Sequence, residues 1–448
     1  MTRIERDFLG EMEIPETALY GIQSARAREN FSLGYRNTNT RLLRAMILVK
    51  KAAALTYTQL EEGPDKAVYQ AVAEACDCLL AGEGADMFIV DALQGGAGTS
   101  TNMNVNEVLA NRALGILGEP AGSYHIIHPL DHVNRGQSTN DVYPTALRIA
   151  AVALLRDLSG QCAKLQEALQ KRENEFDGVK KLGRTELMDA VPITLGSAFG
   201  AFAQGIARDR WRLYKIEERL RQVNLGGTAV GLSGNAERKY RYLVIEKLRE
   251  LTGMGLAASE YPMDITQNND VFVEVSGLLK ALSVNLMKIA GDLRLMNSGP
   301  RGGFGEIRLA ALQMGSTIMP GKVNPVIPEM VMQIAMKVQA NDYALTMAAG
   351  AGEFELNPFT PLIADALLES LTLLERGVCL FRVNCIETLT ADIKRCAALL
   401  ENSTAFASAF VPALGYDAVS RIVTQHDGEP ERVRENLMRA SKSGGGAD

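Results

Sequence analysis

Apolar residues recur at three- and four-residue steps over long stretches of the chain. Between 271 and 296 such a series lies on one helical face, formed by Val271, Val275, Leu278, Leu282, Leu286, Ile289 and Leu293. The same spacing predicts further long helices over about 141–175, 191–223, 326–350 and 360–383. Apolar and polar residues seldom alternate for long enough to form a strand. The pattern therefore predicts an all-α fold.

The helix faces opposite these apolar series carry small and polar residues with few charges. Ser276, Ser283 and Asn285 are examples on the helix predicted over 271–296. A monomeric bundle is the simplest interpretation. Weakly charged outer faces need a cover, however, which favours a helix bundle shared between copies of the chain.

Polar and charged loops flank the block of long helices near residues 140 and 390. They predict an N-terminal helical domain over 1–140, a central long-helix bundle domain over 141–390 and a small C-terminal helical domain over 391–448. The Ser- and Gly-rich end, residues 441–448, is expected to be flexible.

The overall charge narrows the classes of function. The 448 residues include 47 Lys and Arg and 53 Asp and Glu, which gives a formal net charge of −6. A nucleic-acid-binding protein would need a concentrated basic face. The 6 cysteines and 4 histidines lack the spacing of a disulfide framework or a structural zinc site. The charged N-terminus and the lack of a long apolar run predict a soluble, cytoplasmic protein.

Two short segments rich in Gly, Ser, Thr and Asn stand directly before predicted helices. They are GGAGTSTN at 95–102 and QSTND at 137–141. Taken alone, each is explained as a helix start, with Thr99 or Ser100 as the first cap and a Ser or Thr followed by Asp141 as a capping box. The same arrangement also suits a carboxylate or phosphate, because free N–H groups at a helix N-terminus point toward an anion.

A third polar segment, GSTIMPGKVNP at 315–325, has glycines near both ends. It is not a nucleotide-binding P-loop, because Gly315 and Gly321 are one residue too far apart and Val323 replaces the required Ser or Thr. A mobile loop that closes over a site is the functional alternative. By itself, Lys322 is equally well explained as a solvated surface lysine.

Four motifs in the same order resemble those of the aspartase/fumarase superfamily. GSTIMPGKVNP is similar to the family signature G-S-S-x-x-M-P-x-K-x-N-P, and it is accompanied by GAGTSTNMNVNEV, HPLDHVNRGQSTNDVYPTA and GRTELMDAVPITLG. The resemblance extends from Ile4 to about residue 425. The run STNDVYPT at 138–145 and the continuation NPVIPE at 324–329 are similar to the aspartate ammonia-lyase branch.

This resemblance implies a carbon–nitrogen lyase that uses no metal and no organic cofactor. The implied reaction is anti elimination of ammonia from L-aspartate to give fumarate, with Ser316 on the mobile loop as the base. The implied substrate-binding residues are Thr99, Ser138, Thr139, Asn140, Thr185, Glu186, Thr317, Lys322 and Asn324. The family forms a homotetramer around a shared helix bundle, with each active site built from three subunits, and it implies neither a nucleic-acid nor a membrane partner.

Three departures from the family pattern bear on which substrate the protein accepts. Thr317 replaces the usual second serine but keeps a hydroxyl group. Glu186 stands where His or Gln commonly faces the substrate α-carboxylate, so it would repel a dicarboxylate unless it is protonated or paired with Arg184 or the substrate amine. The helical segment that usually follows the position of Met438 is shortened, which would affect loop closure or substrate range.

Three functions therefore remain open at this stage. The first is elimination of ammonia from L-aspartate. The second is fumarate hydration, or C–N bond cleavage in an N-substituted or modified aspartate. The third is a non-catalytic oligomeric scaffold with the same fold. Ser316, Lys322 and Asn324 favour an enzyme, because a scaffold has no need of them.

Overall fold

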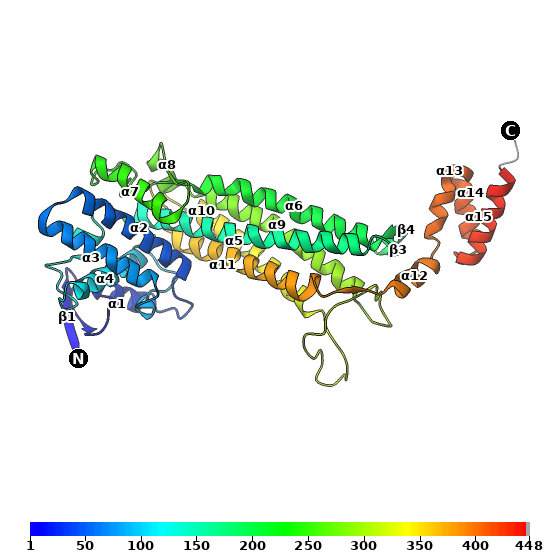
Figure 1. Cartoon of the computed structure of the whole chain (residues 1–448), viewed down its shortest axis with the longest axis horizontal. Helices are drawn as coiled ribbons and strands as arrows, with labels where there is room; N and C mark the ends of the chain where they lie inside the picture. Colours follow the sequence, from blue (N-terminus) through cyan, green and yellow to red (C-terminus); the bar gives the residue numbers. More distant parts are fainter. Residues whose placement is uncertain (445–448) are drawn as a thin grey trace. The chain divides into compact units, whose positions relative to one another are not determined.

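Long helices dominate the computed structural model, which describes residues 1–444 (Figure 1). The predicted long segments correspond to α5 (Thr139–Glu175), α6 (Leu195–Leu220), α9 (Asp270–Met296), α10 (Val326–Gly350) and α11 (Thr360–Phe381). These helices follow the apolar spacing of the sequence closely, and the predicted all-α fold class is confirmed.

The remaining elements are shorter. The other helices are α1 (Ile22–Asn30), α2 (Thr40–Leu60), α3 (Gly63–Leu80), α4 (Thr99–Ile116), α7 (Arg238–Thr252), α8 (Pro262–Gln267), α12 (Ile393–Glu401), α13 (Val411–Leu414), α14 (Tyr416–Gln425) and α15 (Pro430–Gly444), with the short turns η1 (Ala85–Met87), η2 (Pro129–Val133), η3 (Arg382–Ile386) and η4 (Ala405–Phe410). The described strands form two-stranded sheets only: β1 (Thr2–Asp7) with β2 (Gly10–Pro15), β3 (Lys180–Thr185) with β4 (Met188–Thr194), β5 (Gln222–Val223) with β6 (Ala257–Ala258), and β7 (Ile307–Arg308) with β8 (Thr390–Ala391).

The structure corrects two of the predicted boundaries, the start of α6 and the end of α15. Residues 191–194 belong to strand β4, which pairs with β3, so α6 begins only at Leu195. At the C-terminal end, α15 continues through Gly444, so residues 441–444 are helical, and residues 445–448 of the end expected to be flexible lie outside the described residues.

Helix α9 is buried on more than the predicted face. Most of the predicted series is buried, but Val271 and Leu278 are only half-buried. Ser276 and Ser283, on the face expected to be weakly solvated, are buried as well, and the Ser276 hydroxyl donates to Asp342 Oδ1 at 2.8 Å. A helix that buries residues on opposite sides has neighbours on both, which a single apolar stripe does not reveal.

The chain divides into two compact units, each made of three stretches of sequence. Unit 1 comprises Met1–Ser159, Trp211–Ala281 and Lys337–Glu375. Unit 2 comprises Gly160–Arg210, Leu282–Met336 and Arg376–Asp448. The division into 1–140, 141–390 and 391–448 stays a prediction.

Helix α2 is the centre of unit 1, where it packs against α3 and α7. Asn39 starts it, because its side-chain oxygen accepts the backbone N–H of Arg41 at 2.9 Å. Its buried residues include Met46, Val49 and Ala52, which recur at the three-residue spacing of one helical face.

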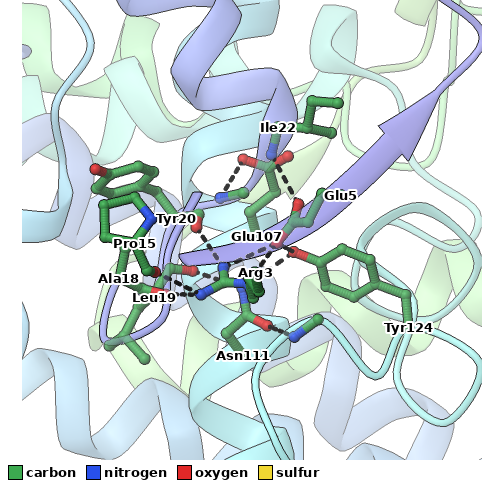
Figure 2. A network of polar contacts seen from close by, with 12 residues as sticks. Arg3, Glu5, Pro15, Ala18, Leu19, Tyr20, Ile22, Glu107, Asn111 and Tyr124 are labelled. Carbon is green, nitrogen blue, oxygen red and sulfur yellow. Dashed lines mark hydrogen bonds and ion pairs between the residues drawn. The ribbon is translucent and has the colours of Figure 1, made fainter. Parts of the chain in front are cut away.

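Buried carboxylates hold the N-terminus of α1 in unit 1 (Figure 2). Glu107 of α4 accepts three backbone N–H groups from residues 21–24 at 2.8 to 3.0 Å. Arg3 pairs with Glu5 at 2.8 Å and donates to backbone carbonyl groups of residues 15–20. These contacts satisfy the free N–H groups of the first helical turn and fix the N-terminal hairpin beside it.

Unit 2 has an aromatic core and a small helical cluster. Phe176 and Phe199 pack edge to face with ring centroids 5.5 Å apart. Helix α12 packs against β3. The helices α13 to α15 and the turn η4 surround a separate set of buried residues, which are Ala407, Val419, Val433 and Leu437. Val433 and Leu437 anchor α15, which explains why the helix continues toward the Ser- and Gly-rich end.

Candidate active site

Helix α5 begins with a capping box at Ser138. The Ser138 hydroxyl oxygen accepts the backbone N–H of Asn140 at 3.2 Å, and Asp141 accepts the backbone N–H of Ser138 at 2.9 Å. The predicted capping box is confirmed. It places the polar side chains of Ser138, Thr139 and Asn140 at the positive end of the α5 dipole.

Asp141 is fully buried and fixes a second loop of unit 1 beside this turn. Its carboxylate accepts the backbone N–H groups of Gly226 and Thr228 at 3.0 and 2.9 Å. Asn140 donates to the carbonyl group of Ala229 in the same loop at 2.8 Å. Burial raises the pKa of Asp141 to about 6, so the carboxylate is ionised at neutral pH and suits its N–H donors.

Lys50 of α2 is a fully buried cation connected to the same turn. Its Nζ donates to Asn134 Oδ1 at 2.8 Å and to Gln137 Oε1 at 3.0 Å. Asn102 Nδ2 donates to Asn134 Oδ1 and to Thr139 Oγ1, both at 3.1 Å. Burial lowers the pKa of Lys50 to about 7. Through the two asparagines, the buried ammonium group is linked to the Thr139 hydroxyl.

Lys50 is not among the residues predicted to form the site, although its place in the sequence carries a signal. Lys50 shares the helical face of Met46, Ala53 and Tyr57, all of which are buried, whereas its neighbour Lys51 pairs with an aspartate at the surface. A lysine at an apolar position of a helical series is uncommon, because an isolated buried charge is costly. Such a position marks a cation that a site can use.

Thr99 is the first residue of α4 and not its cap. Gly98 precedes the helix with φ +89°, and the Thr99 hydroxyl donates to the carbonyl group of Gly96 at 2.8 Å. A Cβ at position 98 would lie 2.3 Å from the ring of Tyr143 on α5, so the starts of α4 and α5 approach closely only because this residue is glycine. The predicted cap at Thr99 or Ser100 is therefore wrong.

Thr185 and Glu186 lie at the tip of the β3–β4 hairpin in unit 2. Thr185 pairs with Met188, so Glu186 and Leu187 form a two-residue turn with φ +54° and +67°. Both turn residues are exposed. Such turns usually contain Asn or Gly, because positive φ is unfavourable for larger side chains.

Arg184 is engaged with a residue other than Glu186. It donates to the buried carboxylate of Glu306 at 2.8 Å, and its guanidinium group lies 4.2 Å from the centre of the Phe304 ring. One of the alternatives for Glu186, an ion pair with Arg184, is not formed, because Arg184 pairs with Glu306.

The loop from Gly315 to Pro325 closes at its base. The backbone N–H of Gly315 donates to the carbonyl oxygen of Lys322 at 2.9 Å, and Asn324 Nδ2 donates to the carbonyl oxygen of Gly315 at 2.9 Å. Lys322 and Asn324 also line a cavity of about 810 Å³ in unit 2, together with Arg294 at the end of α9. The loop base is therefore fixed, with a hollow beside it.

Ser316 is placed just beyond this base. Its hydroxyl oxygen accepts the backbone N–H groups of Ile318 at 3.1 Å and of Met319 at 2.9 Å. Residues 317 to 323 are exposed. Two N–H donors on one oxygen favour a negative charge there, which is the environment that a serine base needs.

The residues predicted to form the site fall into two sets. The set in unit 1 is Thr99, Ser138, Thr139 and Asn140, and the set in unit 2 is Thr185, Glu186, Ser316, Thr317, Lys322 and Asn324. Hydrogen bonds and the contact at Gly98 bring the first set together. For both sets, contact with a substrate stays a prediction.

The sequence profile of a family described as lyase matches residues 10–340. The chain belongs to this lyase family. It is 45% identical to the aspartate ammonia-lyase of a Bacillus species over 439 residues, which are 98% of this chain and 93% of the relative. It is likewise 45% identical to the aspartate ammonia-lyase of Pseudomonas aeruginosa, over 98% of this chain and 94% of the relative.

Solved structures agree with this family. A protein described as fumarate lyase:delta crystallin from Brucella melitensis, bound to cobalt, superimposes with a TM-score of 0.91 at 45% identity and covers 100% of this chain and 96% of its own. A class II fumarase from Schistosoma mansoni gives 0.92 at 28% identity over 98% and 96%. Membership of the aspartase/fumarase superfamily, on its aspartate ammonia-lyase branch, is confirmed. Within residues 1–444, every helix is too short or too polar to cross a bilayer.

Proposed function

We propose that this lyase eliminates ammonia from L-aspartate to give fumarate, with Ser316 as the base that removes the Cβ proton. The observation that supports this most directly is the pair of backbone N–H groups, from Ile318 and Met319, on the Ser316 hydroxyl oxygen. The relatives of similar length that are named aspartate ammonia-lyases support the choice of substrate.

The Cβ proton is the difficult part of the reaction. It is weakly acidic because the adjacent carboxylate is already negative, and its removal places a second negative charge on that carboxylate. Fixed hydrogen-bond donors aimed at this group lower the barrier, each by about 3 kcal/mol in sites of the oxyanion-hole type. Hydroxyl groups and helix N-termini supply such donors without adding mobile charge.

In the proposed mechanism, the Ser316 loop removes the Cβ proton and binds a substrate carboxylate. The Ser316 alkoxide takes the Cβ proton, and the C–H electron pair moves into the carboxylate. That pair then returns to form the Cα=Cβ double bond while the C–N bond breaks and the substrate ammonium group leaves as ammonia. The N–H groups of Ile318 and Met319 stabilise the alkoxide before the proton is transferred. Lys322 and Asn324, at the other end of the loop, bind a substrate carboxylate.

The site residues of unit 1 are suited to bind the carboxylate that carries two negative charges after the Cβ proton has been removed. Thr99, Ser138, Thr139 and Asn140 lie at or beside the starts of α4 and α5 and supply neutral donors, once the Thr99 hydroxyl leaves the carbonyl group of Gly96. Behind them, Lys50 is a buried cation that donates only to amide oxygens among the described residues. A positive charge left without an ion-pair partner is stabilised when an anion binds in front of it.

The assembly completes the proposed site. Met336, Tyr343 and Met347 form an exposed apolar stripe along α10, and such a stripe is suited to packing against helices of further copies. We infer a homotetramer in which three subunits contribute to each active site. Thr185, Glu186 and Thr317 then approach the substrate from a different subunit than Thr99 and Ser138.

An ultraviolet assay of fumarate tests this function. L-aspartate, L-malate and argininosuccinate are supplied separately to the purified protein. We expect fumarate release from L-aspartate, with at least about a hundredfold higher kcat/KM than from the other two compounds. Preference for L-malate would indicate a hydratase, and preference for argininosuccinate a lyase for N-substituted aspartates. No release from any of them would contradict an active lyase.

A further inference from the structure

A buried carboxylate joins the hairpin that carries Thr185 to the segment that leads into the Ser316 loop. Glu306 lies in that segment, is fully buried, and forms ion pairs with Lys181 at 3.1 Å and with Arg184 at 2.8 Å, both on β3. We propose that Glu306 is a positioning residue that orients the hairpin tip for substrate binding. This role rests on the proposed function.

Both cations of β3 reach one carboxylate beside an irregularity in the β3–β4 pairing. Lys181 and Arg184 are three residues apart, so in a regular strand their side chains would point to opposite faces. The register shifts between Leu182 and Arg184, at Gly183, where a Cβ would lie 2.6 Å from the carbonyl oxygen of Val191. The extra residue lies on β4, where residues 190 and 191 stand opposite Gly183, and the added twist of such a bulge lets both long side chains of β3 reach Glu306.

The hairpin tip requires an anchor because its backbone is strained. Glu186 and Leu187 have φ values of +54° and +67°, in a region that side chains of this size rarely adopt. Strained turns persist where the surrounding structure holds them, and they are common at ligand-binding sites. Arg184 directly precedes Thr185, so its ion pair with Glu306 acts next to the turn.

Backbone hydrogen bonds fix the position of Glu306 itself. The N–H of Glu306 donates to the carbonyl oxygen of Met296, the last residue of α9, at 2.8 Å. The N–H of Asp392 donates to the carbonyl oxygen of Glu306 at 2.9 Å. Glu306 is thus held rigidly between α9 and the start of α12, and its carboxylate transmits this position to β3.

A purely structural role would give a different result from positioning. Removing one partner of a buried ion cluster leaves the other charges unpaired and lowers stability, so a purely structural role predicts a lower unfolding temperature with an unchanged KM. Glu306→Gln retains the size and the backbone contacts of the side chain but weakens both ion pairs. If Glu306 orients the tip, the loss is seen in substrate binding and not only in the unfolding temperature.

The test compares Glu306→Gln with a neighbouring control in the full-length protein. We expect Glu306→Gln to raise KM for L-aspartate about tenfold and to change kcat by less than about threefold. Asp392→Asn is the matched control, since it weakens the ion pair of Asp392 with Arg308 at 3.0 Å and leaves Arg184 paired. Its KM should stay within about twofold of the wild type. An equal rise in both variants overturns the proposal.

A double-mutant cycle shows whether Glu306 acts through the tip. In a Thr185→Ala background, Glu306→Gln should raise KM no further, because the contact that it orients is gone. Independent, multiplicative effects of the two substitutions overturn the positioning role. If Glu306→Gln does not fold, Arg184→Lys replaces it in the same cycle, since lysine keeps a charge beside Glu306 but not the fork of donors.

Hydrogen exchange, which needs no substrate, tests the positioning role of Glu306 independently of the proposed function. If the wild-type protein releases no fumarate from L-aspartate, the proposed function fails. The positioning role is then judged by hydrogen exchange of the backbone amides from Thr185 to Met188. Glu306→Gln should accelerate their exchange about tenfold, whereas Asp392→Asn should not. Unchanged exchange in Glu306→Gln overturns the role.

Discussion

The hydroxyl oxygen of Ser316 lies 2.9 Å from the backbone nitrogen of Met319 and accepts its N–H. The N–H of Ile318 reaches the same oxygen at 3.1 Å. Serine is a poor base in water, and these two donors lower the free energy of its deprotonated form relative to the neutral hydroxyl. If Ser316 is the base, as we propose, the backbone of this turn supports its deprotonated form.

Replacing Ser316 by alanine tests the assignment of the base. Ser316→Ala should lower kcat for L-aspartate by roughly a thousandfold, the size of a general-base contribution. The unfolding temperature should stay unchanged, because the loop base is closed by Gly315, Lys322 and Asn324 without the hydroxyl group. Turnover and thermal melts measured on the same preparation give both values. Near-normal turnover would remove Ser316 from the mechanism.

Glu186→Gln tests how the hairpin tip meets the substrate. Arg184 is paired with Glu306, so the exposed carboxylate of Glu186 keeps its full repulsion toward a dicarboxylate. Removing one such charge near a protein surface is worth about 1 kcal/mol, which corresponds to roughly a fivefold lower KM for L-aspartate. Steady-state kinetics at low salt measures this. A much larger gain would indicate that the natural substrate carries a positive or altered group, and no change would place Glu186 away from the substrate.

Lys50→Met should change how stability depends on pH. Burial lowers the pKa of Lys50 to about 7 in the folded protein, whereas the ordinary lysine value of 10.5 applies to the unfolded chain. Between these values the unfolded chain binds more protons, so this residue makes the wild type more stable as pH rises through that window. The methionine variant lacks this gain. Its Tm should therefore fall relative to the wild type from pH 7 upward.

Lys51→Met is the matched control for this measurement, because Lys51 pairs with Asp77 at the surface. Melting curves are recorded for the wild type and both variants across the same series of buffers. Parallel Tm curves for the wild type and Lys50→Met would show that Lys50 is not the buried titrating cation.

Two glycines of the α4 region should respond to alanine in opposite directions. Gly98→Ala forces a Cβ to 2.3 Å from the Tyr143 ring at φ +89°, so it should destabilise the protein by about 3 kcal/mol or more and lower activity through Thr99. Gly115, inside the same helix, has open space around it, so Gly115→Ala should stabilise α4 by about 0.5–1 kcal/mol. Chemical denaturation measures both. Equal effects would contradict the close approach at Gly98.

The helices could be predicted because their signal is local. Apolar spacing of three and four residues placed α5, α9, α10 and α11 within a few residues of their observed limits. The capping box at Ser138 was equally visible, since all its members lie within one turn. The start of α6 was missed because the residues before it pair with β3 in a hairpin whose turn, Glu186 and Leu187, lacks the usual Asn or Gly signal.

The site could be predicted only as a set of residues and not as an arrangement. The partner of Arg184 is Glu306, 122 residues later, and no local pattern connects the two. The turn at Glu186 contradicts the preference of its residues for negative φ, so propensity rules point away from it. Lys50 differs, because its place in the apolar series with Met46 and Tyr57 was visible in the sequence, although its hydrogen bonds to Asn134 and Gln137 were not.

The closed base of the Ser316 loop bears on the speed of catalysis. Two hydrogen bonds already join Gly315 to Lys322 and Asn324, so few backbone torsions are left to order when a ligand arrives. The loop therefore loses little conformational entropy when a substrate binds. In the proposed mechanism, Ser316 and Lys322 would therefore approach the substrate together as the loop closes.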